Sequence, residues 1–228
     1  MARIISIEST SQICSVALAE NDKLIALKET SENNHSVVLT QFILDVLNEV
    51  GLKPTDLDAV AVSKGPGSYT GLRIGVSAAK GLCYALDIPL IAVDTLYALA
   101  LSVRALYPEC LICPMIDARR MEVYTALYDT NMNTMLDVHA KILDESSFQD
   151  YLSNHGIVFL GSGAPKTKDV IKSPNAIFDF SHNLSAKNII STAYQRFTDK
   201  NFEDIAYFEP FYLKEFVAKK PVVKALRY

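Results

Sequence analysis

The sequence of 228 residues predicts an α/β fold in which one pattern of strands and helices occurs twice. Each half begins with three short apolar runs separated by turn residues, and each then alternates helical patterns with short buried-strand patterns. Such an order produces a mixed sheet flanked by helices. We expect βββαβαβα twice, in an N-terminal domain over 1–106 and a C-terminal domain over 107–228 whose last helix and tail pack back on the first.

The first half opens with a meander of strands. Turn formers at 9–12 and the pair Asn21-Asp22 separate three β-rich runs. A helix is then predicted over 36–50, because apolar residues recur at helical spacing and Gly51 follows as a stop. The expected elements are strands at 3–8, 13–19, 24–28, 59–62 and 90–93 and helices at 36–50, 70–86 and 95–106.

The same order begins again after Pro108. A turn at Asn131-Met132-Asn133 separates two strands, and Ser185 is placed to cap the last helix. Two such units meeting along one interface would leave a cleft, which is the ribonuclease H-like plan of the actin, Hsp70 and sugar kinase ATPase superfamily. The expected elements are strands at 111–116, 122–128, 135–142, 157–160 and 177–180 and helices at 145–154, 164–171 and 185–197.

The composition is that of a globular protein in a reducing compartment. Half of the residues are hydrophobic, and the net charge of -4 provides no global attraction for polyanions. Glu8 stands where a signal peptide would continue its apolar stretch, and no apolar run is long enough to cross a bilayer. The four cysteines are scattered among apolar residues, as reduced thiols are. We therefore expect a cytoplasmic protein without a membrane segment.

Residues 65–75 contain the sharpest local motif, with glycines at a predicted strand-to-helix turn. Glycine there permits unusual dihedral angles and lets another backbone come close. The segment is neither a Walker A loop nor a complete dinucleotide fingerprint. A structural glycine loop and a ligand-binding loop both remain open at this point. The glycines concerned are Gly65, Gly67, Gly71 and Gly75.

The residues of common catalytic sites are not arranged as catalysis requires. Ser68 lacks the flanking glycines of a nucleophile elbow, since Pro66 and Thr70 occupy those places. The histidines lack the spacing that would bring two imidazoles to one helical face. We therefore predict no catalytic residue and no metal ligand. The four histidines are His35, His139, His155 and His182.

Two surfaces are candidates for binding a partner. The helices over 36–50 and 70–86 would form an interface if they presented apolar side chains to solvent, although core packing is the usual arrangement. The C-terminal basic residues could contact nucleic-acid phosphates, although Glu209 and Glu215 among them favour a solvated tail. The candidate interface residues are Val38, Leu39, Phe42, Leu72, Val76 and Lys80, and the basic ones are Lys214, Lys219, Lys220, Lys224 and Arg227.

Several motifs together resemble the TsaB (YeaZ) family over essentially the full length of the chain. The segment over 65–75 is the most specific of them. The supporting motifs are Ile7-Glu8-Ser9-Thr10-Ser11, Asp117-Ala118-Arg119-Arg120-x-Glu122-Val123-Tyr124 and Gly161-Ser162-Gly163-Ala164.

The resemblance implies a non-catalytic, glycoprotease-like (Kae1-like) paralogue of the threonylcarbamoyl transferase TsaD. Thr95 and Leu99 stand where TsaD has metal-binding histidines, and neither side chain can replace them. The implied role is to bind TsaD through the two N-terminal helices and to activate it, together with the ATPase TsaE, for transfer of threonylcarbamoyl to adenosine 37 of tRNA. The tRNA would be reached through the complex, and homodimers would use an overlapping surface.

The resemblance also bears on nucleotide binding. The first turn carries Glu8 and Ser9 where ATP-binding members of the superfamily have Asp-x-Gly, so ATP or ADP is expected only in the complex. An ATP-dependent phosphotransferase or a glycoprotease-like enzyme is the alternative, and it would need a phosphate loop or a metal pair. A peptidoglycan-related or chaperone-like interaction protein also stays open.

Overall fold

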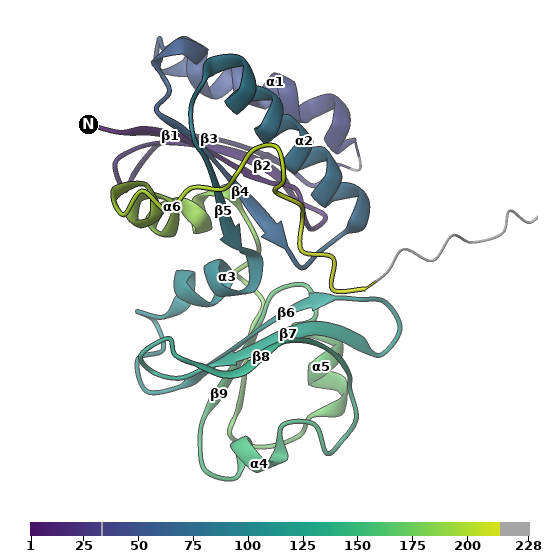
Figure 1. The fold of residues 1–228 in the computed structure, drawn as a ribbon. Helices are drawn as coiled ribbons and strands as arrows, with labels where there is room; N and C mark the ends of the chain where they lie inside the picture. The colour runs from purple at the N-terminus through teal and green to yellow at the C-terminus, as the bar shows by residue number, and fades with distance from the viewer. Residues whose placement is uncertain (33, 215–228) are drawn as a thin grey trace, which may run out of the picture.

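The computed structural model describes residues 1–32 and 34–214 of the chain. It has two lobes, each formed by one twisted sheet with helices against it (Figure 1). The elements follow the predicted order twice, which confirms the duplicated α/β architecture. Within the described ranges, none of the helices has the length and apolarity that a membrane span requires.

The sheet of the first lobe has the strand order β3-β2-β1-β4-β5. The first three strands pair antiparallel as a meander, and β4 and β5 add in parallel on the other side of β1. The parallel strands are almost entirely buried because helices cover both faces of this part of the sheet. The strands are β1 (Arg3–Glu8), β2 (Cys14–Glu20), β3 (Lys23–Thr30), β4 (Ala59–Gly65) and β5 (Leu90–Asp94), and the helices on one face are α1 (His35–Glu49) and α2 (Tyr69–Leu86), with a 3-10 turn η1 (Pro54–Asp56) between α1 and β4.

The sheet of the second lobe repeats this topology as β10-β9-β6-β7-β8. Its meander is again antiparallel, and β9 and β10 again add in parallel. The strands are β6 (Leu111–Asp117), β7 (Glu122–Tyr128), β8 (Thr134–Ile142), β9 (Ile157–Leu160) and β10 (Ala176–Asp179), and the helices are α4 (Gln149–Leu152) and α5 (Ala164–Val170).

The helix predicted over 145–154 was wrong in extent, because α4 is a single turn. The Asp144 carboxylate accepts hydrogen bonds from the Ser146 backbone N–H and from the hydroxyls of Ser146 and Ser147. Such local side-chain bonds compete with helical hydrogen bonds. Phe148 then takes a left-handed conformation, so regular helix begins only after it.

The third helix of each half packs across the molecule. Leu96 and Leu99 of α3 (Thr95–Val103) lie in a core cluster with β6, β7 and β9 of the second sheet. The 3-10 turn η2 (Ala186–Ile189) and helix α6 (Ile190–Thr198) place Ile189 and Ala193 against β1, β4 and β5 of the first sheet. In Figure 1, α3 lies between the lobes and α6 lies beside the upper sheet. Each lobe therefore contributes a helix to the core of the other. The domain boundary between residues 106 and 107 stays a prediction.

The chain after α6 returns over the first lobe, and we call residues 203–214 the C-terminal strap (Figure 1). The Glu203 N–H donates to the Leu90 carbonyl at 2.9 Å, and the Phe211 N–H donates to the Lys64 carbonyl at 2.7 Å. The Lys80 ammonium of α2 donates to the carbonyls of Phe208 at 3.0 Å and Ala206 at 3.5 Å. The strap is thus held along α2 and the end of β4.

Candidate functional site

The glycine segment brings α2 into direct contact with the turn between β1 and β2. A Cβ on Gly71 would lie 1.9 Å from the carbonyl oxygen of Ser9, and one on Gly75 would lie 2.3 Å from the Ser9 hydroxyl. The Ser9 hydroxyl donates to the Gly71 carbonyl at 2.8 Å. The backbone of α2 therefore fills the space beside this turn, and only glycine allows that approach.

The other two glycines of the segment also lie in close contacts. Gly65 has φ of +115°, and a Cβ there would lie 2.6 Å from the Phe211 carbonyl of the strap. A Cβ on Gly67 would lie 2.5 Å from Cβ of Thr10. Each of the four glycines thus has a packing reason, which favours the structural interpretation of the segment over the ligand-binding one.

Glu8 is a fully buried carboxyl at the end of β1. One of its oxygens accepts from the Thr10 N–H and hydroxyl, both at 2.6 Å, and the other bonds to the Ser63 hydroxyl. Burial raises the pKa of Glu8 above its usual range, against the lowering effect of these bonds. The polar groups of the turn are therefore bound to one another, inside the protein.

The raised pKa of Glu8 predicts a specific pH dependence of stability. Above the ordinary pKa of about 4.5, the unfolded chain releases this proton while the folded protein keeps it, so the free energy of unfolding falls as pH rises toward the folded pKa. Glu8→Gln keeps a neutral side chain that still accepts from Thr10 and donates to Ser63. Relative to wild type, the variant is expected to gain stability in urea denaturation as the pH rises above about 4.5. A difference that is constant with pH would contradict the raised pKa.

Thr95 and Leu99 stand where TsaD has metal-binding histidines, and in this protein both have structural roles. The Thr95 hydroxyl accepts from the Gly65 N–H at 3.1 Å, which joins the start of α3 to the end of β4. Leu99 is fully buried in the core between α3 and the second sheet. No group of three His, Cys, Asp or Glu side chains suited to a metal gathers within residues 1–32 and 34–214.

Three of the six predicted interface residues belong to the core, so the assignment of these three as contact residues is corrected. Leu39, Leu72 and Val76 have exposed fractions of 1%, 1% and 4%. Val38 and Phe42 are half-buried against the same cluster. The apolar stripes of α1 and α2 face their own sheet, because covering that sheet removes the most apolar surface from water. The ammonium of Lys80, the sixth candidate, binds the strap.

Other residues of these helices form the exposed surface. We define the outer helical face as Val37, Gln41 and Leu44 of α1 with Ser77, Gly81 and Tyr84 of α2, all exposed. Val37, Leu44 and Tyr84 are 72%, 43% and 85% exposed, and α1 and α2 lie side by side (Figure 1). Val37 and Leu44 are seven residues apart and lie outside the apolar stripe of α1 that faces the sheet. This spacing is the signal by which they could have been identified from the sequence.

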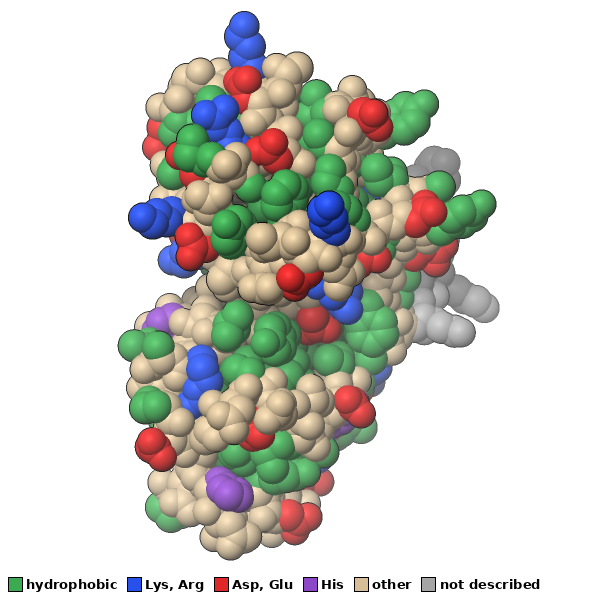
Figure 2. Space-filling model, turned by 60° about the vertical axis from the view of Figure 1, so that its left-hand side comes forward, with side chains coloured by type: hydrophobic (Ala, Val, Ile, Leu, Met, Phe, Trp, Pro, Cys, Tyr) green, Lys and Arg blue, Asp and Glu red, His purple; other side chains and the backbone are tan. Residues whose placement is uncertain are grey.

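A polar pocket of about 320 Å³ lies between the lobes, on the side of α3 and α6. Figure 2 shows this side of the molecule, where the space-filling surface narrows to a waist between the lobes. Burial raises the pKa of Asp94 in this pocket, and burial with the Asp94 charge raises that of Tyr128. A cleft between the halves is therefore present, on the opposite side of the lobe junction from the strap end. The pocket is lined by Asp94, Tyr97, Tyr128, Thr134, Asp137, Val138, Thr192 and Arg196.

Known proteins resemble this chain in sequence and in fold. A family model described as "TsaD: tRNA N6-adenosine threonylcarbamoyltransferase" matches residues 27–225. The tRNA threonylcarbamoyladenosine biosynthesis protein TsaB of Bacillus subtilis is 35% identical over 203 residues, covering 84% of this chain and 81% of that protein. TsaB of Escherichia coli is 30% identical over 227 residues, covering 96% and 97%.

The fold gives the same assignment. The solved structure of YeaZ from Pseudomonas aeruginosa has a TM-score of 0.80 at 25% identity and covers 93% of this chain and 100% of that one. Its likeness extends over both lobes. This chain therefore belongs to the TsaB (YeaZ) family of tRNA threonylcarbamoyladenosine biosynthesis proteins.

Proposed function

We propose that this chain is an accessory subunit that binds and activates a TsaD-like catalytic subunit for the transfer of threonylcarbamoyl to adenosine 37 of tRNA. The observation that carries the proposal is the filled β1–β2 turn. In ATP-binding members of this fold a phosphate approaches that turn, whereas here Gly71 and Gly75 bring the backbone of α2 against Ser9. A first turn closed in this way suits a binding subunit better than a phosphotransferase.

The outer helical face supports a partner-binding role. Val37, Leu44 and Tyr84 expose apolar surface on two adjacent helices, next to the small residues Ser77 and Gly81. Small residues let another helix approach closely, and exposed apolar and aromatic side chains supply most of the binding energy in interfaces. We infer that the catalytic subunit binds this face, that a second copy of this chain competes for it, and that a TsaE-like ATPase joins the assembled complex in the cytoplasm.

An omission assay tests this function. Purified chain, its TsaD-like and TsaE-like partners, threonylcarbamoyl-AMP and unmodified tRNA are combined, and modified adenosine is measured with each protein left out in turn. We expect modification to fall to background without this chain and to be absent with this chain alone. Modification that proceeds unchanged in its absence would refute the activator role, and modification by the isolated chain would show an enzyme instead.

A further inference from the structure

The turn between β6 and β7 carries two arginines whose charge is not neutralised. Arg119 and Arg120 are both exposed. Neither guanidinium makes a hydrogen bond or an ion pair with any residue that the structure describes. The two positive charges therefore face solvent at the tip of a hairpin.

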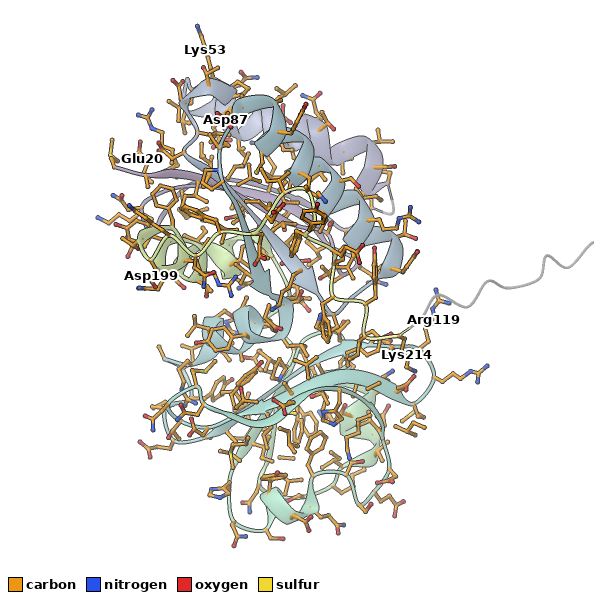
Figure 3. All side chains as sticks on the ribbon, in the orientation of Figure 1. Glu20, Lys53, Asp87, Arg119, Asp199 and Lys214 are labelled. Carbon is orange, nitrogen blue, oxygen red and sulfur yellow. The ribbon has the colours of Figure 1, made fainter. Side chains whose placement is uncertain are left out.

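The acidic side chains beside this turn are already paired. The Lys166 ammonium donates to the Asp117 carboxylate at 2.7 Å and to the Arg120 carbonyl at 2.8 Å. Lys214, at the end of the described strap, pairs with the Glu122 carboxylate. Figure 3 shows Arg119 and Lys214 together at this edge of the molecule. The four basic side chains around this turn thus outnumber the two acidic ones, and Arg119 and Arg120 carry the excess positive charge.

The backbone of this turn would suit other residues better. Arg119 and Arg120 have φ of 71° and 50°, in the left-handed region that favours glycine and asparagine. Arginine at both positions works against the local preference of the turn. Side chains that oppose local preference are often retained for binding.

Aromatic side chains lie beside the basic hairpin. The Tyr212 ring contacts the Tyr69 ring with centroids 4.9 Å apart, and it is 37% exposed. The Arg73 guanidinium lies 5.6 Å from the centroid of the Tyr69 ring. Because Tyr212 is two residues from Lys214, the strap joins this aromatic pair to the hairpin. The further basic residues Lys219, Lys220, Lys224 and Arg227 lie outside the described residues.

We propose that Arg119, Arg120, Lys214 and Tyr212, which we call the hairpin surface, bind RNA. Arginine donates bidentate hydrogen bonds to phosphate, and exposed tyrosine rings stack unpaired bases of RNA loops. In a protein of net charge -4, only such a local surface can attract a polyanion. That the RNA is a tRNA rests on the proposed function. That this surface binds RNA is inferred from its unpaired arginines and its exposed tyrosine.

The charge contribution is tested in the complex with the catalytic subunit. The affinity for unmodified tRNA is measured by filter binding over a range of salt concentrations for wild type, for R119Q with R120Q, and for the control K23Q with K53Q. The control lysines are exposed on the first lobe, and Figure 3 shows Lys53 at its far end. We expect the arginine variant to bind about ten-fold more weakly, with a log–log salt slope smaller by about 1.4 to 1.8, and the control to bind as wild type.

The stacking contribution is tested by a matched pair of strap variants. Tyr212→Leu is expected to weaken tRNA binding at least about five-fold, as the loss of one stacked base does. Tyr207→Leu removes a more exposed tyrosine, 84% exposed, from the same strap and is expected to have no effect. Thermal melting of each variant separates loss of folding from loss of contact.

The possible outcomes separate this inference from the proposed function. Unchanged affinity and salt slope in the arginine variant would overturn the hairpin surface as an RNA site. If that variant instead fails to join the catalytic subunit, measured by gel filtration, the surface binds an acidic protein and the inference is also overturned. If the wild-type chain forms no complex at all, the proposed function fails, and binding of tRNA to the isolated chain still decides the inference.

Discussion

Replacing Gly71 with alanine is expected to lower the free energy of unfolding by about 3 kcal/mol, the upper part of the usual range for overpacking. The added methyl would lie 1.9 Å from the Ser9 carbonyl oxygen, so the backbone must move. Moving it would disturb the bond between Ser9 and Gly71 and the buried carboxyl network of Glu8 beside it. No flexible side chain is available there to absorb the clash.

Gly81 provides a matched control on the same helix. A Cβ at Gly81 meets nothing within 4 Å, so Gly81→Ala adds helix propensity without a clash. It is expected to raise the free energy of unfolding by roughly 0.5–1 kcal/mol. Urea denaturation of both variants measures the contrast. Equal stabilities would mean that α2 does not pack against the β1–β2 turn, and this turn would then no longer favour a binding subunit over a phosphotransferase.

Placing charge on the outer helical face is expected to have the largest functional effect. Val37→Glu with Leu44→Glu should weaken binding to the TsaD-like subunit at least about 30-fold, because two apolar contacts at the centre of an interface are replaced by carboxylates that must lose their water. Folding should be little affected, since these side chains are 72% and 43% exposed in the free chain. Gel filtration and calorimetric titration measure the complex, and modified adenosine should fall in parallel.

Ile142→Glu is the control for this variant. Ile142 lies on β8 of the second lobe and, at 72%, has the same exposed fraction as Val37, so Ile142→Glu matches the Val37→Glu part of the variant at a different location. It should bind the partner as wild type does. If both variants bind normally, the outer helical face is not the docking surface. If the homodimer is lost while the complex persists, the two surfaces do not overlap as proposed.

The order of elements could be predicted from the sequence because it depends on local patterns. The helix predicted over 36–50 is found at His35–Glu49, since the spacing of its apolar residues and Gly51 define it without help from the rest of the chain. The glycine segment and the family could be identified for the same reason. The helix over 145–154 could not, because bonds of the Asp144 side chain outweigh the helical pattern there.

The roles of individual side chains needed the tertiary structure. A periodic stripe shows that Leu39 and Val76 share an apolar face, but both a sheet and a partner can cover such a face, and only packing shows that the sheet does. Lys80 likewise binds Phe208, which is 128 residues away, so no local pattern could assign it.

The sequence by itself determined the duplicated α/β plan, the family and the presence of a glycine-rich strand-to-helix turn, because each depends on neighbouring residues or on characteristic motifs. Tertiary structure alone decided that α3 and α6 pack on the opposite sheets, that the strap covers α2, and that Lys214 reaches the hairpin of Arg119. The physical reason is that these contacts join segments far apart in the chain. Their partners are selected by burial of apolar surface and by charge pairing once both lobes have formed.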